Sequence, residues 1–306
     1  MAPKTVFITG CGPGGIGSAL ATEFHMRGHR VIASSEDLPT HLQDIGIETT
    51  VLDVTSEESI AKAVTHVSKL TDGKLDILIN NAGVLHIMPF AHTDITAARR
   101  VLDVNVIGVL AVTQGFLPLL MAGAVAAKKN GDGSGKETAL VANIGSVNAE
   151  MRPAFFGIYN ASKAAVDALG GTIRPELAPL GIRVVTVKTG AVGTGLFAST
   201  PLTKLPEDSP YEPIREHIES RKNPEAYAEQ VVGELLKRYV KPAIWCGPLS
   251  TFAWILTWFG WEGMTDTLYI RGNSLHNFGS MEPRIVRRSG DAKWLQILLE
   301  ANDKLR

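Results

Sequence analysis

Cysteine is scarce in this sequence: its 306 residues contain two, Cys11 and Cys246. Two thiols cannot form the disulfide framework of a small secreted domain, and neither lies in the spacing of a metal-binding motif. No stretch with the features of a signal peptide precedes the first apolar run, at residues 5–8. We therefore expect a reduced, cytoplasmic setting and no metal site.

An excess of charge of one sign is also lacking. Lys and Arg total 30 against 31 Asp and Glu, which gives a formal net charge of −1. Proteins that bind the phosphate backbone of nucleic acids usually carry a basic excess, so we expect no nucleic-acid partner. No uninterrupted apolar run reaches the length of a membrane span. Residues 243–261 come nearest, and Gly247 and Pro248 interrupt them.

What the sequence does contain is a regular alternation of short β-branched runs and amphipathic stretches over its first two-thirds. Continuous apolar strands that alternate with helices indicate a parallel sheet covered by helices on both faces. Because crossovers between parallel strands are right-handed, we expect an α/β protein with a Rossmann-type doubly wound sheet. The six expected strands are residues 6–8, 30–33, 49–52, 75–79, 139–144 and 184–187.

Tryptophan marks a second region of the chain. We expect a core over residues 1–240 and a C-terminal extension over residues 241–306 that packs on the same domain. Four of the five tryptophans fall within seventeen residues of this extension: Trp245, Trp254, Trp258 and Trp261. A segment that is apolar on nearly every side is buried or contacts lipid. For residues 243–261, a lid over a site, an interface between copies and a peripheral membrane contact all stay open.

A glycine-rich segment follows the first expected strand. Its glycines are Gly10, Gly12, Gly14, Gly15 and Gly17, and three of them match the spacing GxGxxG. Glycine lets the backbone turn tightly and approach a pyrophosphate, which binds at the amide-rich start of the next helix. Since a strand precedes this loop and a helix follows it, the sequence predicts a dinucleotide cofactor.

Four further motifs follow in order along the chain. Asn80-Asn81-Ala82-Gly83 comes after the fourth expected strand, and Asn105 lies between two valines. Ser146 follows the fifth strand, and Tyr159 precedes Lys163 by four residues. Together with the glycine loop, this set resembles the short-chain dehydrogenase/reductase family over roughly residues 4–240. The form of the glycine loop is similar to that of the fungal 1-acyldihydroxyacetone-phosphate reductase group within that family.

The resemblance implies a set of cofactor-binding residues. The family's glycine motif, TGxxxGxG, is matched here with one extra residue between Gly10 and Gly15, so we expect the phosphate loop to bulge. The motifs after the third, fourth and sixth strands match the family's contacts to adenine, ribose and nicotinamide. The full set is Gly10, Gly15, Ile16, Gly17, Ser34, Ser35, Asp53, Val54, Asn81, Ala82, Gly83, Tyr159, Lys163, Gly190 and Thr194.

The catalytic residues expected from the resemblance are Asn105, Ser146, Tyr159 and Lys163. Tyr159 can supply the proton that a carbonyl oxygen needs when a hydride is added to its carbon. Lys163 lies on the same side of one helix, and its positive charge favours tyrosinate and lowers the pKa of Tyr159. Ser146 is expected to hydrogen-bond the substrate oxygen, and Asn105 to hold a water that links Lys163 to solvent.

The expected cofactor is NADP, with NAD as the alternative. An acid at the end of the second strand would bind the ribose hydroxyls of NAD, but Ser35 stands at that position. Ser34 and Ser35 can hydrogen-bond a 2′-phosphate. Glu36 argues the other way, because many NADP enzymes of the family have arginine there, and the glycine loop contains no Lys or Arg.

The expected substrate is a lipophilic or aromatic ketone, or the corresponding alcohol. The residues expected to line its pocket are mostly apolar: His86, Ile87, Val147, Met151, Phe155, Phe156, Leu196 and Phe197. We expect an oxidoreductase that forms a homo-oligomer. The alternatives are a membrane-surface reductase of acyl-dihydroxyacetone phosphate and a dinucleotide-binding regulator without catalytic activity.

Overall fold

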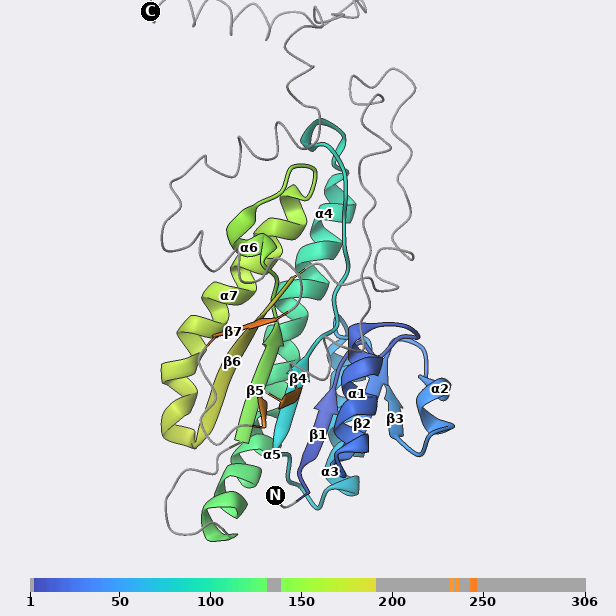
Figure 1. Cartoon of the computed structure of the whole chain (residues 1–306), viewed down its shortest axis with the longest axis vertical. Coiled ribbons are helices and arrows are strands. Elements are labelled where there is room, and N and C mark those ends of the chain that lie inside the picture. Colours follow the sequence, from blue (N-terminus) through green and yellow to red (C-terminus); the bar gives the residue numbers. More distant parts are fainter. Residues whose placement is uncertain (1–2, 131–138, 191–231, 234, 237–242, 247–306) are drawn as a thin grey trace, which may run out of the picture.

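The computed structural model describes residues 3–130, 139–190, 232–233, 235–236 and 243–246. Seven parallel strands form one sheet in the order β3-β2-β1-β4-β5-β6-β7 (Figure 1). The order reverses between β1 and β4, as in a doubly wound fold, so the expected Rossmann-type architecture is confirmed. The strands are β1 (Thr5–Ile8), β2 (Arg30–Ser35), β3 (Glu48–Val51), β4 (Ile77–Asn80), β5 (Ala139–Ile144), β6 (Ile182–Thr189) and β7 (Ala243–Cys246).

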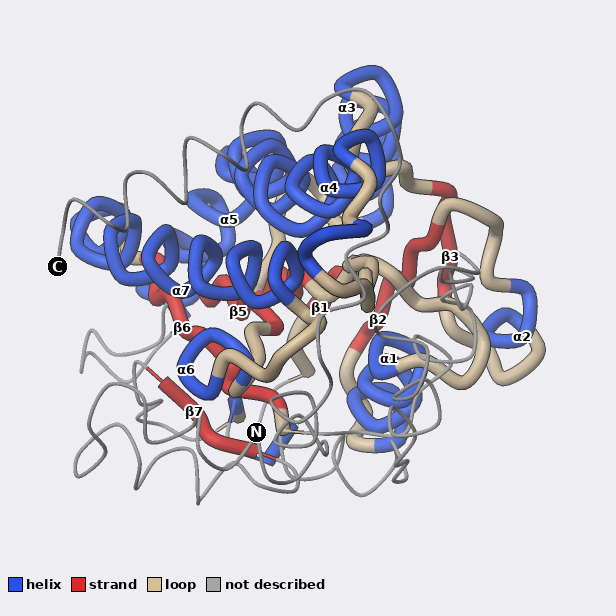
Figure 2. Tube along the Cα trace, turned by 90° about the horizontal axis from the view of Figure 1, so that it is seen from above, coloured by secondary structure: helices blue, strands red, loops and turns tan. Residues whose placement is uncertain are grey.

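Helices cover both faces of the sheet (Figure 2). Helices α3, α4, α5 and α7 lie on one face, and α1 lies on the other. The helices are α1 (Ile16–Met26), α2 (Thr40–Gln43), α3 (Glu57–Leu70), α4 (Ile95–Leu102), α5 (Gly108–Asn130), α6 (Asn148–Met151) and α7 (Gly157–Leu177). Shorter turns are η1 (Phe90–His92), the π-helical turn η2 (Asp103–Ile107) and η3 (Ala178–Leu180).

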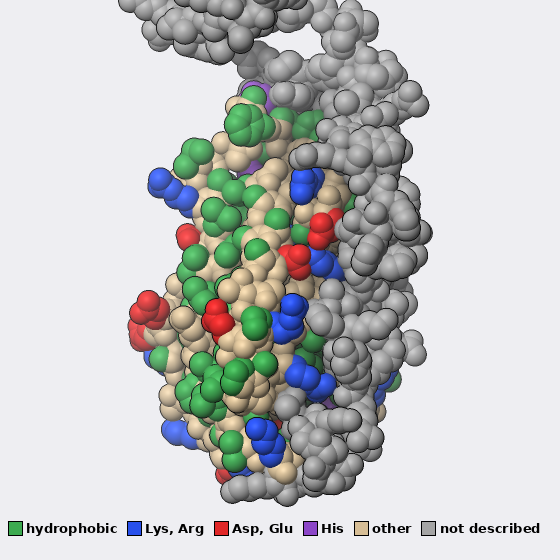
Figure 3. Space-filling view, turned by 90° about the vertical axis from the view of Figure 1, so that its left-hand side faces the viewer, with side chains coloured by type: hydrophobic (Ala, Val, Ile, Leu, Met, Phe, Trp, Pro, Cys, Tyr) green, Lys and Arg blue, Asp and Glu red, His purple; other side chains and the backbone are tan. Residues whose placement is uncertain are grey.

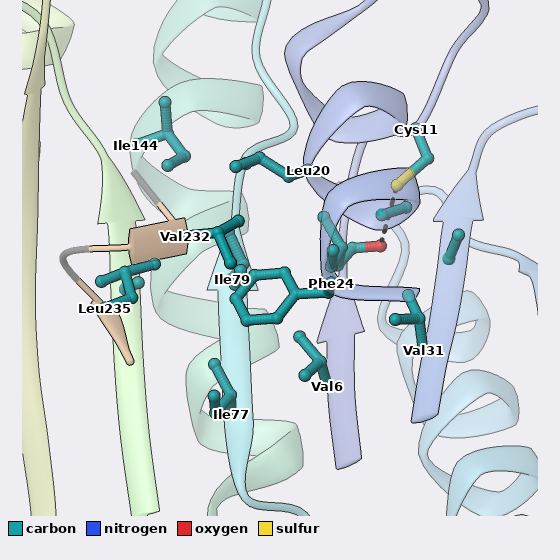
Figure 4. Close-up of a cluster of buried hydrophobic side chains, with 14 of the residues drawn as sticks. Val6, Cys11, Leu20, Phe24, Val31, Ile77, Ile79, Ile144, Val232 and Leu235 are labelled. Atoms are coloured by element: carbon teal, nitrogen blue, oxygen red, sulfur yellow. Dashed lines mark hydrogen bonds between the residues drawn. The ribbon is translucent and has the colours of Figure 1, made fainter. Parts of the chain in front are cut away.

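The central strands are buried on both faces because successive side chains of a strand point in opposite directions. In β1, Val6 and Ile8 face α1, where Leu20 and Phe24 pack against them (Figure 4). Phe7 faces the opposite side, where its ring stacks on Phe116 of α5 with the centroids 4.4 Å apart. The continuous apolar runs of the sequence therefore reflect two hydrophobic cores, one on each side of the sheet.

The sheet extends beyond the six expected strands. Residues 243–246 pair in parallel with β6, from Thr186 opposite Ala243 to Thr189 opposite Cys246. The first part of the segment 243–261 therefore belongs to the sheet, and the division of the chain into residues 1–240 and 241–306 stays a prediction. The tryptophans at positions 254, 258, 261 and 294 lie outside the described residues.

One continuous helical stretch within the described chain, Ile95–Lys128, is long and apolar enough to cross a membrane by length and composition. Its inward side chains Val104, Val112, Phe116 and Leu120 belong to the hydrophobic core beneath the sheet. We therefore assign this stretch as the central core helix of its layer. On the side of the molecule shown in Figure 3, acidic and basic side chains are mixed among hydrophobic ones.

Candidate active site

The candidate site lies at the carboxyl ends of β1, β4 and β5, next to the point where the strand order reverses. The glycine loop leaves β1, the Asn-Asn-Ala-Gly segment leaves β4, and Ser146 follows β5. Parallel pairing aligns these three strand ends, with Asn80 opposite Asn143. Segments far apart in sequence thus meet at one edge of the sheet (Figure 1).

The glycine loop is fixed to the end of β4 by hydrogen bonds. Asn81 Nδ2 donates to the carbonyl oxygens of Thr9 and Gly10, at 2.8 and 2.9 Å. In return, Thr9 Oγ1 accepts hydrogen bonds from the backbone N–H groups of Asn81 and Ala82. Gly10 has a φ of +72°, and an added Cβ would lie 2.6 Å from the Cα of Ala82. The loop is therefore held in one shape and needs glycine at this turn.

The start of α1 has the features of a phosphate site. Its N-cap is Gly15, no side chain caps the free amides, and the first turn contains no acid. At Gly17 an added Cβ would lie 2.5 Å from both Asn81 Nδ2 and the Gly10 oxygen, so the first turn of α1 packs directly against the glycine loop and needs glycine there. Free amides at a helix start favour an anion. These residues fit the phosphates of a dinucleotide.

Asn105 joins three parts of the site. Its Oδ1 accepts a hydrogen bond from the Val84 N–H at 2.8 Å, and its Nδ2 donates to the Val84 oxygen and to Ser162 Oγ. The residue is 1 % exposed and lies in the π-helical turn η2, which widens the helix between α4 and α5. Both amide protons are used, so the side chain cannot donate one to a water.

Lys163 is a buried cation beside Asn105 and the β5 end. Its Nζ donates to the Ile144 oxygen at 2.9 Å, and burial lowers its pKa to about 8. A Cβ on Gly83 would lie 3.7 Å from Nζ and 3.3 Å from Asn105 Oδ1. The glycine therefore keeps open the space above the lysine.

Tyr159 lies one helical turn before Lys163 on α7. The Lys163 Nζ is 5.7 Å from the centre of the Tyr159 ring. Burial raises the pKa of Tyr159 to about 12, and a hydrogen bond with the Ser146 side chain opposes that shift. The pKa of Tyr159 is therefore raised and not lowered as expected, because burial outweighs the other influences. The structure brings the expected tyrosine, lysine, serine and asparagine together, with the phenol in its neutral, proton-carrying form.

Comparison with known proteins agrees with this geometry. Residues 4–204 match the short chain dehydrogenase family. The short-chain dehydrogenase fogD of Aspergillus ruber is 36% identical over 282 residues, which cover 89% of this chain and 93% of that protein. The short-chain dehydrogenase ptmH of Penicillium ochrochloron is 41% identical over 250 residues, covering 78% and 86%. The chain belongs to the short-chain dehydrogenase family.

Solved structures show the same fold. A short-chain dehydrogenase from Streptomyces avermitilis superposes with a TM-score of 0.68 at 24% identity, covering 92% of this chain and 98% of that one. One from Burkholderia cenocepacia, in complex with NADP, has a TM-score of 0.66 at 21% identity, covering 88% and 96%. This short-chain dehydrogenase is an oxidoreductase that acts on CH–OH or C=O groups with a nicotinamide dinucleotide. The resemblance to the acyldihydroxyacetone-phosphate group stays a prediction.

One expected cofactor residue, Ser34, is placed differently from its predicted role in this short-chain dehydrogenase, and the predicted contact of Asp53 with adenine stays a prediction. Ser34 is fully buried, and its hydroxyl donates to the Ile8 oxygen at 3.0 Å, so it does not face the cofactor. Asp53 Oδ1 accepts hydrogen bonds from the N–H and hydroxyl of Thr55 and thereby shapes the turn after β3. Val54, next to it, packs against Gly108 at the start of α5. Gly190 directly follows β6 and is the last described residue of this part of the chain, and Thr194 lies outside the described residues.

Sequence reasoning missed an ion-pair cluster behind the site. Lys188 of β6 is 4% exposed at its side chain, and its Nζ lies 2.9 Å from Glu150 of α6 and 2.6 Å from Asp167 of α7. This cluster joins the helix that carries Tyr159 to the segment that follows Ser146. The available signal was a lysine within a continuous apolar strand, because a charge buried there needs opposite charges nearby.

We expect Gly17→Ala to disrupt the phosphate loop, because the methyl group would overlap Asn81 Nδ2 and the Gly10 oxygen. The variant should bind NADP⁺ and NAD⁺ at least about tenfold more weakly and should melt at a lower temperature. Titration by intrinsic fluorescence and a thermal melt measure these effects. Gly12→Ala is the stability control, since its Cβ would meet nothing within 4 Å. Equal melting temperatures for both variants would contradict the packing argument.

Proposed function

We propose that this short-chain dehydrogenase reduces a lipophilic ketone to a secondary alcohol with NADPH, or catalyses the reverse oxidation. The observation that carries the proposal is an aromatic wall beside the proton donor. The Phe156 ring meets the Tyr159 ring edge-on, with the centroids 6.4 Å apart. An aromatic side chain at this distance favours an apolar group next to the reacting carbonyl.

Two loops form the wall of the proposed substrate site. The Met88 N–H donates to the Phe155 oxygen at 2.8 Å, which joins the loop after β4 to the loop before α7. Arg152 and Phe155 have φ values of +50° and +70°, a strained conformation that surrounding contacts must hold. Strain of this kind is common at ligand sites and supports a substrate role for this loop.

His86 offers a polar contact in this otherwise apolar wall. Its Nε2 is buried and has no hydrogen-bond partner among the residues that the structure describes, and burial lowers the pKa of the imidazole despite the opposing charge of Asp94. A buried nitrogen without a partner is costly, and a polar group on the ligand would satisfy it. Ile87, Val147 and Met151 are the other described residues expected to line the site, while the expected Leu196 and Phe197 lie outside the described residues.

Four side chains have separate roles in the proposed reaction. When bound, the nicotinamide dinucleotide supplies the hydride that adds to the carbonyl carbon. Tyr159 gives its proton to the carbonyl oxygen as negative charge develops there, and the Ser146 hydroxyl donates a hydrogen bond to the same oxygen. The Lys163 ammonium stabilises the tyrosinate that remains. Asn105 holds Lys163's helix and the loop after β4 in fixed positions through Ser162 and Val84.

NADPH is the proposed reductant because the end of β2 lacks the acid that would bind the ribose hydroxyls of NAD. Ser35 occupies the last position of the strand and is half-buried. Its hydroxyl is suited to a phosphate oxygen, and the buried Ser34 is not available for that role. The choice between the two cofactors then depends on the charges around Ser35.

We also propose that the enzyme self-associates through the outer face of α5. Four exposed apolar residues recur at helical spacing along this face: Leu110, Pro118, Met121 and Val125. Ile107, in the adjoining turn η2, and Val125 leave 54% and 53% of their surface exposed. The exposed Gln114 interrupts this face between Leu110 and Pro118. Exposed apolar side chains gathered on one side of a long helix support an interface between two copies.

The proposed function is tested by assaying the purified enzyme on aliphatic and aromatic ketones with NADPH and NADH. We expect turnover of apolar ketones and a higher kcat/KM with NADPH. Tyr159→Phe removes the acidic proton and keeps the ring, so kcat should fall at least about 10²-fold while NADPH binding persists. Undiminished reduction by Tyr159→Phe would refute the role of the phenol. Activity restricted to small polar ketones would refute the proposed substrate class.

The pH profile should report the Lys163 ammonium. Because its pKa is lowered to about 8, the charge is present below that pH and is lost as the pH rises through it. Tyr159, with a pKa of about 12, stays protonated over this range. We expect kcat/KM for ketone reduction to fall above about pH 8. Lys163→Arg keeps the charge and should abolish this fall, and a fall at the same pH in that variant would contradict the assignment.

Leu110→Glu should weaken self-association, because it places a charge among the exposed apolar side chains of α5. Light scattering coupled to size-exclusion chromatography should show a lower mass than for the wild type at the same concentration. Met26→Glu is the matched control, since Met26 is an apolar residue of α1 that is 73% exposed. A monomeric wild-type protein, or an equal mass change in both variants, would rule out this interface.

A further inference from the structure

The end of β2 lies between the glycine loop and the turn after β3. The Cys11 N–H donates to the Ser34 oxygen at 2.8 Å, and the Leu52 N–H donates to the Ser35 oxygen at 2.8 Å. In a dinucleotide-binding sheet the adenosine ribose lies over this strand end, because the pyrophosphate is held at the start of the first helix. A 2′-phosphate on that ribose would therefore lie close to Ser35 and the residues that follow it.

The charges on this strand end are unfavourable for a phosphate. Glu36 and Asp37 follow Ser35 directly, and residues 10–17 of the glycine loop contain no Lys or Arg. A phosphomonoester carries about −1.5 to −2 charges at neutral pH, so two neighbouring carboxylates would repel it. NADPH binding at this site requires a cation from another part of the chain.

Arg100 of α4 supplies a cation at this place. Its guanidinium lies 3.7 Å from the Glu36 carboxylate, although the two residues are 64 positions apart in the sequence. The side chains are 66% and 64% exposed, so the pair is open to solvent. Exposed ion pairs of this length contribute little to stability, and exchanging the carboxylate for another anion costs little.

The backbone that carries Arg100 is held in place at both ends of α4. At the start of α4, the Asp94 carboxylate accepts a hydrogen bond from the Ala97 N–H at 2.8 Å. At the other end, the turn η2 contains Asn105, which is fixed to Val84 and Ser162. A guanidinium on a fixed helix, with a long side chain free to turn, can move from Glu36 to a phosphate beside it.

We propose that Arg100 binds the 2′-phosphate of NADPH and is the residue that makes this enzyme prefer the phosphorylated cofactor. The planar guanidinium can donate two parallel hydrogen bonds to phosphate oxygens, and a phosphate attracts it more strongly than a single carboxylate does. Glu36 then holds Arg100 near the ribose site before the cofactor binds. This inference rests on the proposed use of NADPH.

The test uses two cofactor fragments that bind without any catalytic step, 2′,5′-ADP and 5′-AMP. Their dissociation constants are measured by calorimetry for the wild type, Arg100→Gln and Arg99→Gln. Arg100→Gln should weaken 2′,5′-ADP at least about tenfold and leave 5′-AMP within about twofold. Arg99→Gln removes the same charge from an exposed neighbour on the same helix and should leave both constants unchanged.

The outcomes separate this inference from the proposed function. Wild-type enzyme that binds 5′-AMP as tightly as 2′,5′-ADP would overturn the proposed preference for NADPH. A wild-type preference for 2′,5′-ADP that survives Arg100→Gln would overturn the role of Arg100 alone. An equal loss in the Arg99 and Arg100 variants would also overturn it, because the effect would then be one of general charge.

Discussion

The three hydrogen bonds of the Asn105 side chain are the constraint on which the site depends. They join the loop after β4, the turn between α4 and α5, and the helix that carries Tyr159 and Lys163. Asn105 is almost fully buried, so each of these bonds forms in a medium where an unmade bond is costly. A break at this residue would release three segments at once. The π-helical turn η2 is the local distortion that brings the amide into reach of all three partners.

The same burial sets the pKa values of Tyr159 and Lys163, the proposed catalytic pair. Lys163 donates to the Ile144 oxygen, and its pKa falls to about 8, whereas the pKa of Tyr159 rises to about 12. Burial disfavours the charged form of each group, and the two charged forms have opposite signs. A neutral phenol next to a cation that is still charged near neutral pH is the state that a carbonyl reductase needs before proton transfer. Burial therefore keeps the Tyr159 phenol protonated before the reaction, and the Lys163 charge stabilises the tyrosinate that forms.

The sequence predicted what depends on local pattern. The sheet followed from the alternation of apolar runs, and the glycine loop and the proposed catalytic residues came from short motifs. Ser34 was assigned wrongly, because β2 is buried on both faces from Val31 to Ser34, and the alternation of strand side chains places Ser34 on the same face as the buried Ile32. The Lys188 cluster and the contact between Arg100 and Glu36 join distant segments. The lysine within an apolar strand indicates that Lys188 needs opposite charges nearby, but no local pattern identifies the partners of either pair, because the crossovers bring those segments together.

An arginine on α4 would select NADPH over NADH from a helix, and not from the end of strand β2. On the strand end, Glu36 would repel a phosphate, yet the same carboxylate holds Arg100 close to it. The helix that carries Arg100 runs directly into the turn that contains Asn105. The residue proposed to select the cofactor and the residues proposed to reduce the carbonyl therefore share one support. A change that loosened η2 would therefore displace Arg100 as well as the helix that carries Tyr159 and Lys163. The hydrogen bonds of Asn105 hold η2 in place, which is the structural reason for a buried polar residue at this position.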